Sequence, residues 1–233
     1  MAAAVKRPGG ELANRPLHFF WIADCSGSMY GDKIQKLNYA VRQTIPDMKT
    51  AANDNPNAQV LVRVLKFSTG AQWAQATPVS IYDFDSEWND LTASGVTDMG
   101  KAFDLLADQL KIPPMSDRAL PPILVLLSDG QPTDEYKKSL NDLKALPWGK
   151  KAVKVAISIG QDADDNVLCE FTGNKELVIQ ANNAPALVKA IKWASTLVKE
   201  VSSPASQREG SGSAPVVVNL DNIPSATDDP DVW

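Results

Sequence analysis

The sequence predicts an α/β fold in which βα units surround a mostly parallel sheet with an antiparallel edge. Two patterns predict this class. Short apolar runs alternate with longer segments in which apolar residues recur every three or four positions, as on one face of a helix. In addition, residues 123–128 (ILVLLS) form a nearly continuous apolar run, which is typical of a strand buried on both faces of a parallel sheet.

The first half of the chain supplies two strands, one helix and a hairpin. A strand is predicted over residues 17–23 (LHFFWIA). Apolar residues at helical spacing predict a helix over 34–48, and Pro46 is expected to kink this helix or end it early. The second strand covers 60–67. A Ser-Thr-Gly turn and a short polar-apolar run over 68–79 predict an antiparallel edge hairpin.

The second half continues the alternation of strands and helices, with no internal repeat of sequence. Two prolines at 121–122 disfavour helical structure just before the buried strand. The remaining elements are helices over 99–110, 136–143 and 187–201 and strands over 123–128, 153–159 and 176–180.

Composition excludes several classes of protein. No apolar stretch approaches the roughly 20 residues of a membrane-spanning helix. Two cysteines and one histidine cannot build a four-ligand Cys/His zinc site, and they make a disulfide scaffold a poor fit. The formal net charge of −5 argues against binding to a nucleic-acid backbone, because that affinity rests on clustered Lys and Arg. We therefore expect neither a membrane nor a nucleic-acid partner.

The chain divides into a central domain and two end segments. Residues 1–15 contain basic residues and glycines but no apolar core of a secretory signal, so we expect a flexible N-terminus and a cytoplasmic protein. Residues 16–201 hold all the predicted elements. Residues 202–233 carry five acidic residues against one basic residue and are rich in Ser, Pro and Gly, a composition that predicts a disordered acidic tail.

Polar loops follow the predicted strands at the positions where ligands bind in open α/β sheets. The first strand leads into a loop with Asp24, Ser26 and Ser28 at alternate positions, so that the three side chains can converge on one point. Asp129 directly follows the buried strand, and Thr97 lies in a loop just before a helix. We expect these five side chains to meet.

The five side chains are all oxygen donors, two anionic and three neutral. Such a set suits a hard cation, Mg²⁺ or Mn²⁺. Hydroxyls in place of further carboxylates leave the charge of the cation less compensated, so that a carboxylate from a protein partner can complete the octahedron. The pattern therefore predicts a binding site more than a catalytic one.

The same residues carry a family resemblance. The motif Asp24-Cys25-Ser26-Gly27-Ser28, with Thr97 in a Gly-Val-Thr-Asp loop and Asp129 in Leu-Ser-Asp-Gly-Gln, resembles the metal-ion-dependent adhesion site of von Willebrand factor A (VWA) domains. The resemblance covers about residues 16–200. It implies a Rossmann-like, doubly wound sheet of six strands with helices on both faces, and the metal ligands named above. The residues of the first motif are most similar to those of bacterial TerY-like members. Those members are linked to tellurium resistance and stress response, and they resemble partners of a kinase and a phosphatase.

Two other functions remain open at this point. An Asp after the first strand and another after a later one also fit a Mg²⁺-dependent phosphotransfer enzyme or phosphoacceptor. Phosphatases of the haloacid-dehalogenase type, however, use a second carboxylate two residues after the first as a general acid. In this sequence that residue is Ser26. No Gly-rich phosphate loop with its Lys is present either. A third possibility is a scaffold in which the metal only ties loops together.

Residues beside the motif have simpler expected roles. Asp98 is expected to cap a helix or to support the site indirectly, and Asp134 to cap the helix that follows it. Cys25 lies inside the metal loop, but the only histidine, His18, begins the strand whose far end carries that cysteine. At ~3.3 Å per residue the two are about 20 Å apart, which disfavours Cys-His catalysis. The leading interpretation is a metal-dependent interaction module that is not an enzyme. Tyr30 flanks the site and can contact a partner.

Overall fold

The computed structural model describes residues 15–56, 58–202 and 223–224. It contains one sheet with the strand order β3-β2-β1-β5-β6-β7, and the two-residue strand β4 pairs with β2 beside this path. The strands are β1 (Arg15–Asp24), β2 (Ala58–Ser68), β3 (Gly70–Trp73), β4 (Val79–Ser80), β5 (Ile123–Ser128), β6 (Val153–Ile159) and β7 (Val178–Ala181). The predictions of a flexible N-terminus and of a disordered acidic tail fall almost entirely on residues outside these ranges.

The predicted α/β sheet is confirmed. Strands β2, β1, β5, β6 and β7 run parallel, and β3 pairs antiparallel with β2 and forms the edge of the sheet. Strand β4 is a second short antiparallel partner of β2, at Leu61 and Val62. Strand β5 is buried along its whole length, as its continuous apolar sequence predicts.

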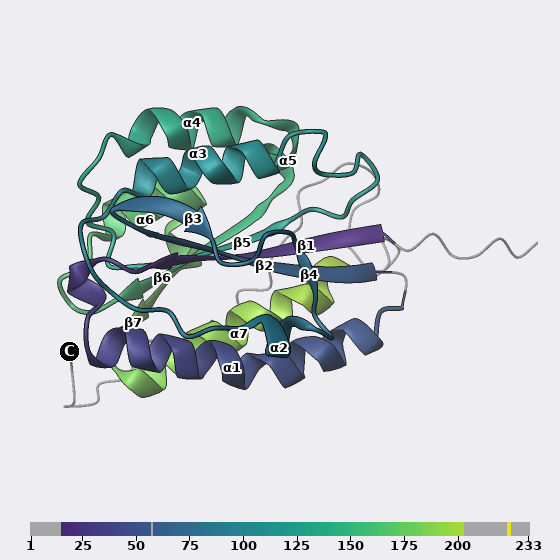
Figure 1. Ribbon diagram of the computed structural model, residues 1–233, viewed down its shortest axis with the longest axis horizontal. Coiled ribbons are helices and arrows are strands. Elements are labelled where there is room, and N and C mark those ends of the chain that lie inside the picture. The colour runs from purple at the N-terminus through teal and green to yellow at the C-terminus, as the bar shows by residue number, and fades with distance from the viewer. Residues whose placement is uncertain (1–14, 57, 203–222, 225–233) are drawn as a thin grey trace, which may run out of the picture.

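Helices cover both faces of the sheet (Figure 1). The longer helices are α1 (Asp32–Asn53), α3 (Met99–Gln109), α4 (Tyr136–Ala145), α6 (Asp165–Thr172) and α7 (Ala184–Ser202), and the short ones are α2 (Phe84–Glu87), α5 (Pro147–Lys151) and the 3₁₀ turns η1 (Gly27–Met29) and η2 (Lys175–Leu177). Helices α1 and α7 pack together on one face of the sheet, over a core that includes Phe19 and Trp21 of β1. Helices α3, α4 and α6 close the other core, around Phe20 and Ile22.

Helix α1 corrects the expectation that Pro46 ends the helix early. The helix continues through Pro46 to Asn53. Proline has no N–H, so the carbonyl of Arg42, four residues before Pro46, lacks its usual helical donor. Both residues are exposed, so water can bond that carbonyl. The buried face of α1, which packs on α7, holds the rest of the helix in place because tertiary packing outweighs local propensity.

Helix α6 was not predicted from the sequence. Its apolar residues Val167, Leu168 and Phe171 are buried, and the side chain of Asp164 accepts a hydrogen bond from Asn166 N (3.0 Å) at its start. Two turns are too short for the helical spacing to stand out. Within the described part of the chain, no helix is long and apolar enough to cross a membrane.

The connection order determines where a ligand site forms. From the central strand β1 the chain moves to β2 on one side, and it later returns to β5 on the other side. The carboxyl ends of β1 and β5 therefore flank the point where the strand order reverses, the usual binding crevice of such sheets. Asp24 ends β1 and Asp129 follows β5.

Candidate metal centre

The first loop of the candidate centre begins at Asp24, the last residue of β1. One carboxylate oxygen of Asp24, Oδ1, accepts a hydrogen bond from Ser26 N (2.8 Å), which folds the chain back over the strand end. The hydroxyl oxygens of Ser26 and Ser28 lie 3.0 Å apart. Asp24 and Ser26 are buried, and Ser28 is exposed. The three side chains therefore gather at one point that is open to solvent beside Ser28.

Backbone contacts tie the second loop, residues 94–97, to the first. Ser94 N donates to Cys25 O (2.7 Å), and Gly27 N donates to Gly95 O (3.0 Å). Glycine at position 27 favours this close approach, because a Cβ there would make a tight contact of 3.2 Å with Gly95 O. The second loop thus places Thr97, which is 5% exposed, beside the Asp24–Ser28 loop.

The third loop follows β5 and is tied to both others. Ser128 Oγ donates to Asp24 Oδ2 (2.6 Å), a contact between residues 104 positions apart. Thr133 N donates to Thr97 O (2.9 Å), and Thr97 N donates to Thr133 Oγ1 (3.0 Å). The structure therefore brings all three predicted loops together, and with them Asp24, Ser26, Ser28, Thr97 and Asp129.

Asp129 has the most telling environment of the five. Its carboxylate is fully buried, and its Oδ1 receives only a long hydrogen bond from Gln131 N (3.4 Å). Its Oδ2 is buried and has no hydrogen-bond partner among the described residues. A buried carboxylate oxygen without a donor is costly, so this atom fits a site that a cation completes.

The electrostatics of Asp24 agree with this view. Burial raises the pKa of Asp24 to about 6, hydrogen bonds from Ser128 and Ser26 oppose the shift, and the neighbouring charge of Asp129 adds to it. The protein without metal thus holds Asp24 in an environment that disfavours its negative charge. No group of three or more His, Cys, Asp or Glu side chains able to hold a metal occurs in the described chain.

Two acidic residues beside the site have roles that differ in part from the expected ones. Asp134 does not cap the helix that follows it: its carboxylate accepts from Gly100 N (2.9 Å) and Lys101 N (3.1 Å), at the start of α3. Asp98 occupies the N-cap position of α3, but its Oδ2 accepts from Gly70 N (2.7 Å) and Lys101 Nζ (2.6 Å). The hydrogen bond from Lys101 is the main reason that the pKa of Asp98 is lowered. Both carboxylates therefore hold the second loop and the start of α3.

The residues considered for covalent chemistry lie in unreactive environments. Burial is the main reason that the pKa of the Cys25 thiol rises to about 12, which leaves almost no thiolate at neutral pH. His18 lies near the opposite end of β1, where burial, assisted by the charge of Arg63, lowers its pKa to about 4. Neither side chain has the partner that a nucleophile and base need.

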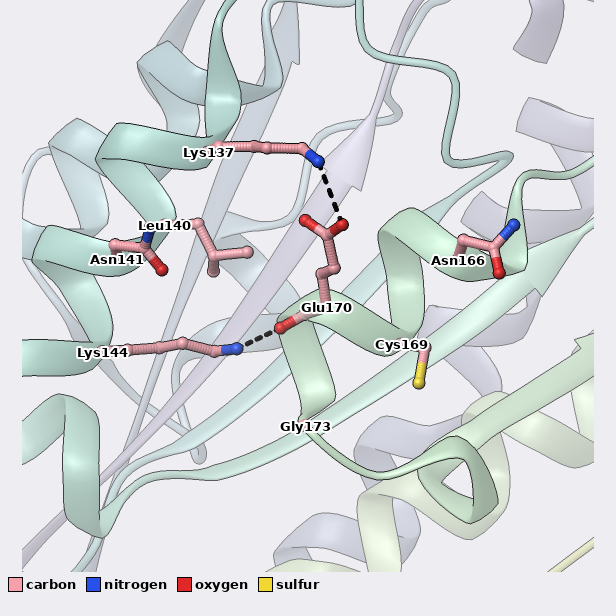
Figure 2. Close-up of a pocket in the computed structure, with 8 residues that line it drawn as sticks. All are labelled: Lys137, Leu140, Asn141, Lys144, Asn166, Cys169, Glu170 and Gly173. Atoms are coloured by element: carbon pink, nitrogen blue, oxygen red, sulfur yellow. Dashed lines mark hydrogen bonds and ion pairs between the residues drawn. The ribbon is translucent and has the colours of Figure 1, made fainter.

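A separate cavity of about 530 Å³ lies between α4 and α6 and includes none of the five candidate ligands (Figure 2). Lys137 pairs with Glu170 Oε1 (3.3 Å), and Lys144 donates to the backbone oxygen of Glu170. Both lysines are thus held by the wall of this open groove. The candidate metal centre is a cluster of loops at the sheet edge and does not coincide with this hollow.

The fold and the three converging loops define a Rossmann-like domain with an adhesion-type arrangement at the carboxyl ends of its strands. The family model for the von Willebrand factor type A domain matches residues 20–193, and the chain belongs to that family.

Several solved structures share this fold at low sequence identity. Proximal thread matrix protein 1 from the mussel byssus is 19% identical with a TM-score of 0.62, over 82% of this chain and 49% of the mussel chain. A second structure of that mussel protein is described as having a zinc-occupied MIDAS motif (18% identity, TM-score 0.62, 82% and 48% coverage). A von Willebrand factor type A protein from Catenulispora acidiphila is 16% identical (TM-score 0.57, 81% and 43% coverage). This chain spans about half the length of the mussel proteins that it matches. No curated protein matches it.

Proposed function

We propose that this VWA domain is a metal-dependent protein-interaction module. A divalent cation, Mg²⁺ or Mn²⁺, is held by Asp24, Ser26, Ser28, Thr97 and Asp129, and an Asp or Glu of a protein partner completes its coordination. The observation that carries the proposal is Asp129 Oδ2, a buried carboxylate oxygen without a donor beside a second buried carboxylate. A cation supplies the positive charge that both groups lack.

The exposure of the ligands supports a role in binding a partner. Four of the five residues are buried, and Ser28 is exposed. Five protein oxygens leave one position of an octahedron for a further ligand, and the solvent-facing side at Ser28 is where that ligand enters. A purely structural metal site would be closed on all sides, so we favour adhesion over the scaffold role.

Mg²⁺ or Mn²⁺ fits the donor chemistry best, because the five side chains offer only hard oxygen atoms. The zinc named for the mussel protein makes Zn²⁺ a necessary comparison. Calorimetric titration of metal-free protein with Mg²⁺, Mn²⁺ and Zn²⁺ measures the preference. We expect one site per chain.

A non-enzymatic role is part of the proposal. Support comes from the high pKa of Cys25 and from the distant, buried His18, which leave no activated nucleophile beside the candidate metal. Turnover of an aryl phosphate that depends on both Mg²⁺ and Asp24 would refute this part and favour the phosphotransfer alternative.

The finer biological setting rests on the resemblance to TerY-like members. We propose a cytoplasmic, bacterial tellurium-resistance or stress-response complex in which a kinase or phosphatase donates the carboxylate. Tagged protein is incubated with native lysate in Mg²⁺ or in EDTA, and captured proteins are identified by mass spectrometry. A kinase or phosphatase lost in EDTA supports this setting, and its presence in both conditions contradicts it.

Two variants make that experiment specific to the site. Asp129→Ala removes one proposed ligand and should abolish the EDTA-sensitive capture. Asp142→Asn changes an exposed Asp that pairs with Lys138 on α4 (2.6 Å), and it should capture partners as the unmodified protein does. Capture by Asp129→Ala at the level of the Asp142→Asn control would overturn the proposed function.

A further inference from the structure

Two large apolar side chains are exposed at the rim of the candidate metal centre. Tyr30 is 79% exposed and is the most exposed large apolar residue of the described chain, and Val96 is 46% exposed. Tyr30 lies two residues after Ser28 of the first loop, and Val96 directly precedes Thr97. Isolated exposed apolar residues are common on proteins, so the location of these two is what matters.

Backbone hydrogen bonds join the two loops that carry these side chains. Gly27 is the link: its N–H donates to Gly95 O (3.0 Å), next to Val96, and its carbonyl accepts from Tyr30 N (3.1 Å). The neighbour Met29 is fully buried in the core, so the turn directs Met29 inward and Tyr30 outward. Both exposed side chains therefore belong to loops that are bonded to each other around the metal site.

The third loop contributes polar groups to this end of the sheet. Gln131, two residues after Asp129, donates its side-chain N–H to Asp162 O (2.6 Å). The carboxylate of Asp162 lies 3.6 Å from Lys33 Nζ, at the start of α1, so its charge is paired. Tyr30 and Val96 are therefore the large apolar side chains that a partner of the cation meets on the neighbouring loops.

From these exposed apolar side chains we infer that the domain selects a partner segment in which the metal-binding Asp or Glu stands next to a large apolar residue, and that Tyr30 and Val96 contact this residue. The inference rests on the proposed function, because the cation must first draw in the carboxylate. An aromatic side chain at the centre of a contact surface commonly carries much of the binding energy.

The test uses short synthetic peptides in a Gly-Ser background, each with one central Asp and with Leu, Phe, Ser or Asp at the adjacent positions. Peptides are immobilised as an array and probed with the labelled full chain in Mn²⁺ and in EDTA. In Mn²⁺ we expect signals about tenfold stronger beside Leu or Phe than beside Ser, a typical effect of one apolar anchor. Peptides with adjacent Asp should bind no better than those with Ser.

The double variant Tyr30→Ser/Val96→Ser tests the two residues directly. It should retain EDTA-sensitive binding of central-Asp peptides and lose the preference for Leu and Phe. The matched control is Tyr39→Ser/Ile112→Ser, since both of these residues are 54% exposed on other parts of the chain, and it should keep the preference. Calorimetric Mn²⁺ titration of both variants verifies that the metal site is intact.

The outcomes separate the inference from the proposed function. EDTA-sensitive binding of central-Asp peptides with no dependence on the neighbour, or with the same dependence in the rim variant, overturns the inference and leaves the proposed function standing. Absence of any EDTA-sensitive signal, or equal binding of peptides with a central Ala, refutes the proposed function and the inference with it.

Discussion

Strands β1 and β2 carry two buried charged regions of opposite sign. Asp24, at the end of β1, belongs to the metal-loop region, and Arg63, which is 7% exposed, lies in β2 opposite Phe20. The two positions are four residues apart along the strand pair, about 13 Å. Within the described chain, no ion pair reaches Asp24, Asp129 or Arg63.

The two regions differ in how their charges are satisfied. Arg63 donates to Gln75 O (3.0 Å), Ala76 O (2.5 Å) and Gln109 Oε1 (2.7 Å). Its guanidinium also lies 4.1 Å from the centre of the Trp73 ring. We call this region closed, because each of the three guanidinium nitrogens of Arg63 donates to a protein oxygen. Among the residues that the structure describes, Asp129 Oδ2 has no such partner, which agrees with the proposal that a cation completes this region.

The largest expected effect is on the closed region. Arg63→Ala leaves the two backbone carbonyls and Gln109 without their donors and opens space against Trp73, so we expect the free energy of unfolding to fall by about 4 kcal/mol. Urea denaturation measures the change. Metal affinity, by contrast, should stay within about twofold of the unmodified value. A large loss of metal affinity at retained folding would show that the two regions are coupled.

The next prediction uses pH to test the same closed region. His18 stacks on Phe20 at 5.7 Å between ring centres, and its pKa is lowered to about 4 by burial and then by Arg63. Because the folded pKa lies below the unfolded value, His18 contributes its full stability above about pH 6.5, and this is lost as pH falls towards 4. We expect a loss of about 3 kcal/mol from this group.

The variant His18→Phe removes this titration while keeping a ring of similar shape against Phe20. Urea denaturation of both proteins at several pH values between 7.5 and 4 gives the difference in unfolding free energy. That difference should move in favour of the variant as the pH falls. Parallel curves for the two proteins would show that His18 is not the group responsible.

The sequence predicted the open region better than the closed one, for a physical reason. Asp24 and Asp129 each stand directly after an apolar strand, and parallel strands bring their carboxyl ends to one edge, so strand prediction alone places the two carboxylates near each other. Arg63 lies inside a strand, and its partner Gln109 is 46 residues away on α3. Local pattern contains no information about such a contact.

The same reasoning explains the errors near the site. The expected cap by Asp134 was assigned to the nearest helix in sequence, but its carboxylate reaches back 34 residues to Gly100. The uninterrupted α1 depends on packing against α7, which outweighs the local effect of Pro46. In both cases a contact between distant segments decides the outcome, and a single sequence does not display it.

A smaller effect is expected on the stability of the open region. At a metal concentration one hundred times the dissociation constant, the unmodified protein should gain about 2.7 kcal/mol, and Asp24→Asn should gain none. Without metal, Asp24→Asn should be at least as stable as the unmodified protein, because burial disfavours the charged carboxylate. Thermal denaturation with and without Mn²⁺ checks both points, with Asp142→Asn as the control. A variant that is strongly destabilised without metal would mean that this region is closed, like that of Arg63.

The smallest effect concerns the backbone that joins the metal loops. Gly95 has φ +80°, and a Cβ there would lie 2.4 Å from Thr69 Oγ1, so Gly95→Ala should destabilise the fold by about 1 kcal/mol and displace the carbonyl that Gly27 N–H contacts. Gly173→Ala is the matched control, since Gly173 has φ +74° and nothing within 4 Å of an added Cβ. Both variants should lose stability in urea denaturation, Gly173→Ala by the smaller amount because it adds no close contact, and only Gly95→Ala should weaken Mn²⁺ binding, by about tenfold. Equal Mn²⁺ affinity in the two variants would mean that the metal site tolerates displacement of its second loop, and the open region would then depend on Asp24 and Asp129 more than on the exact position of Thr97.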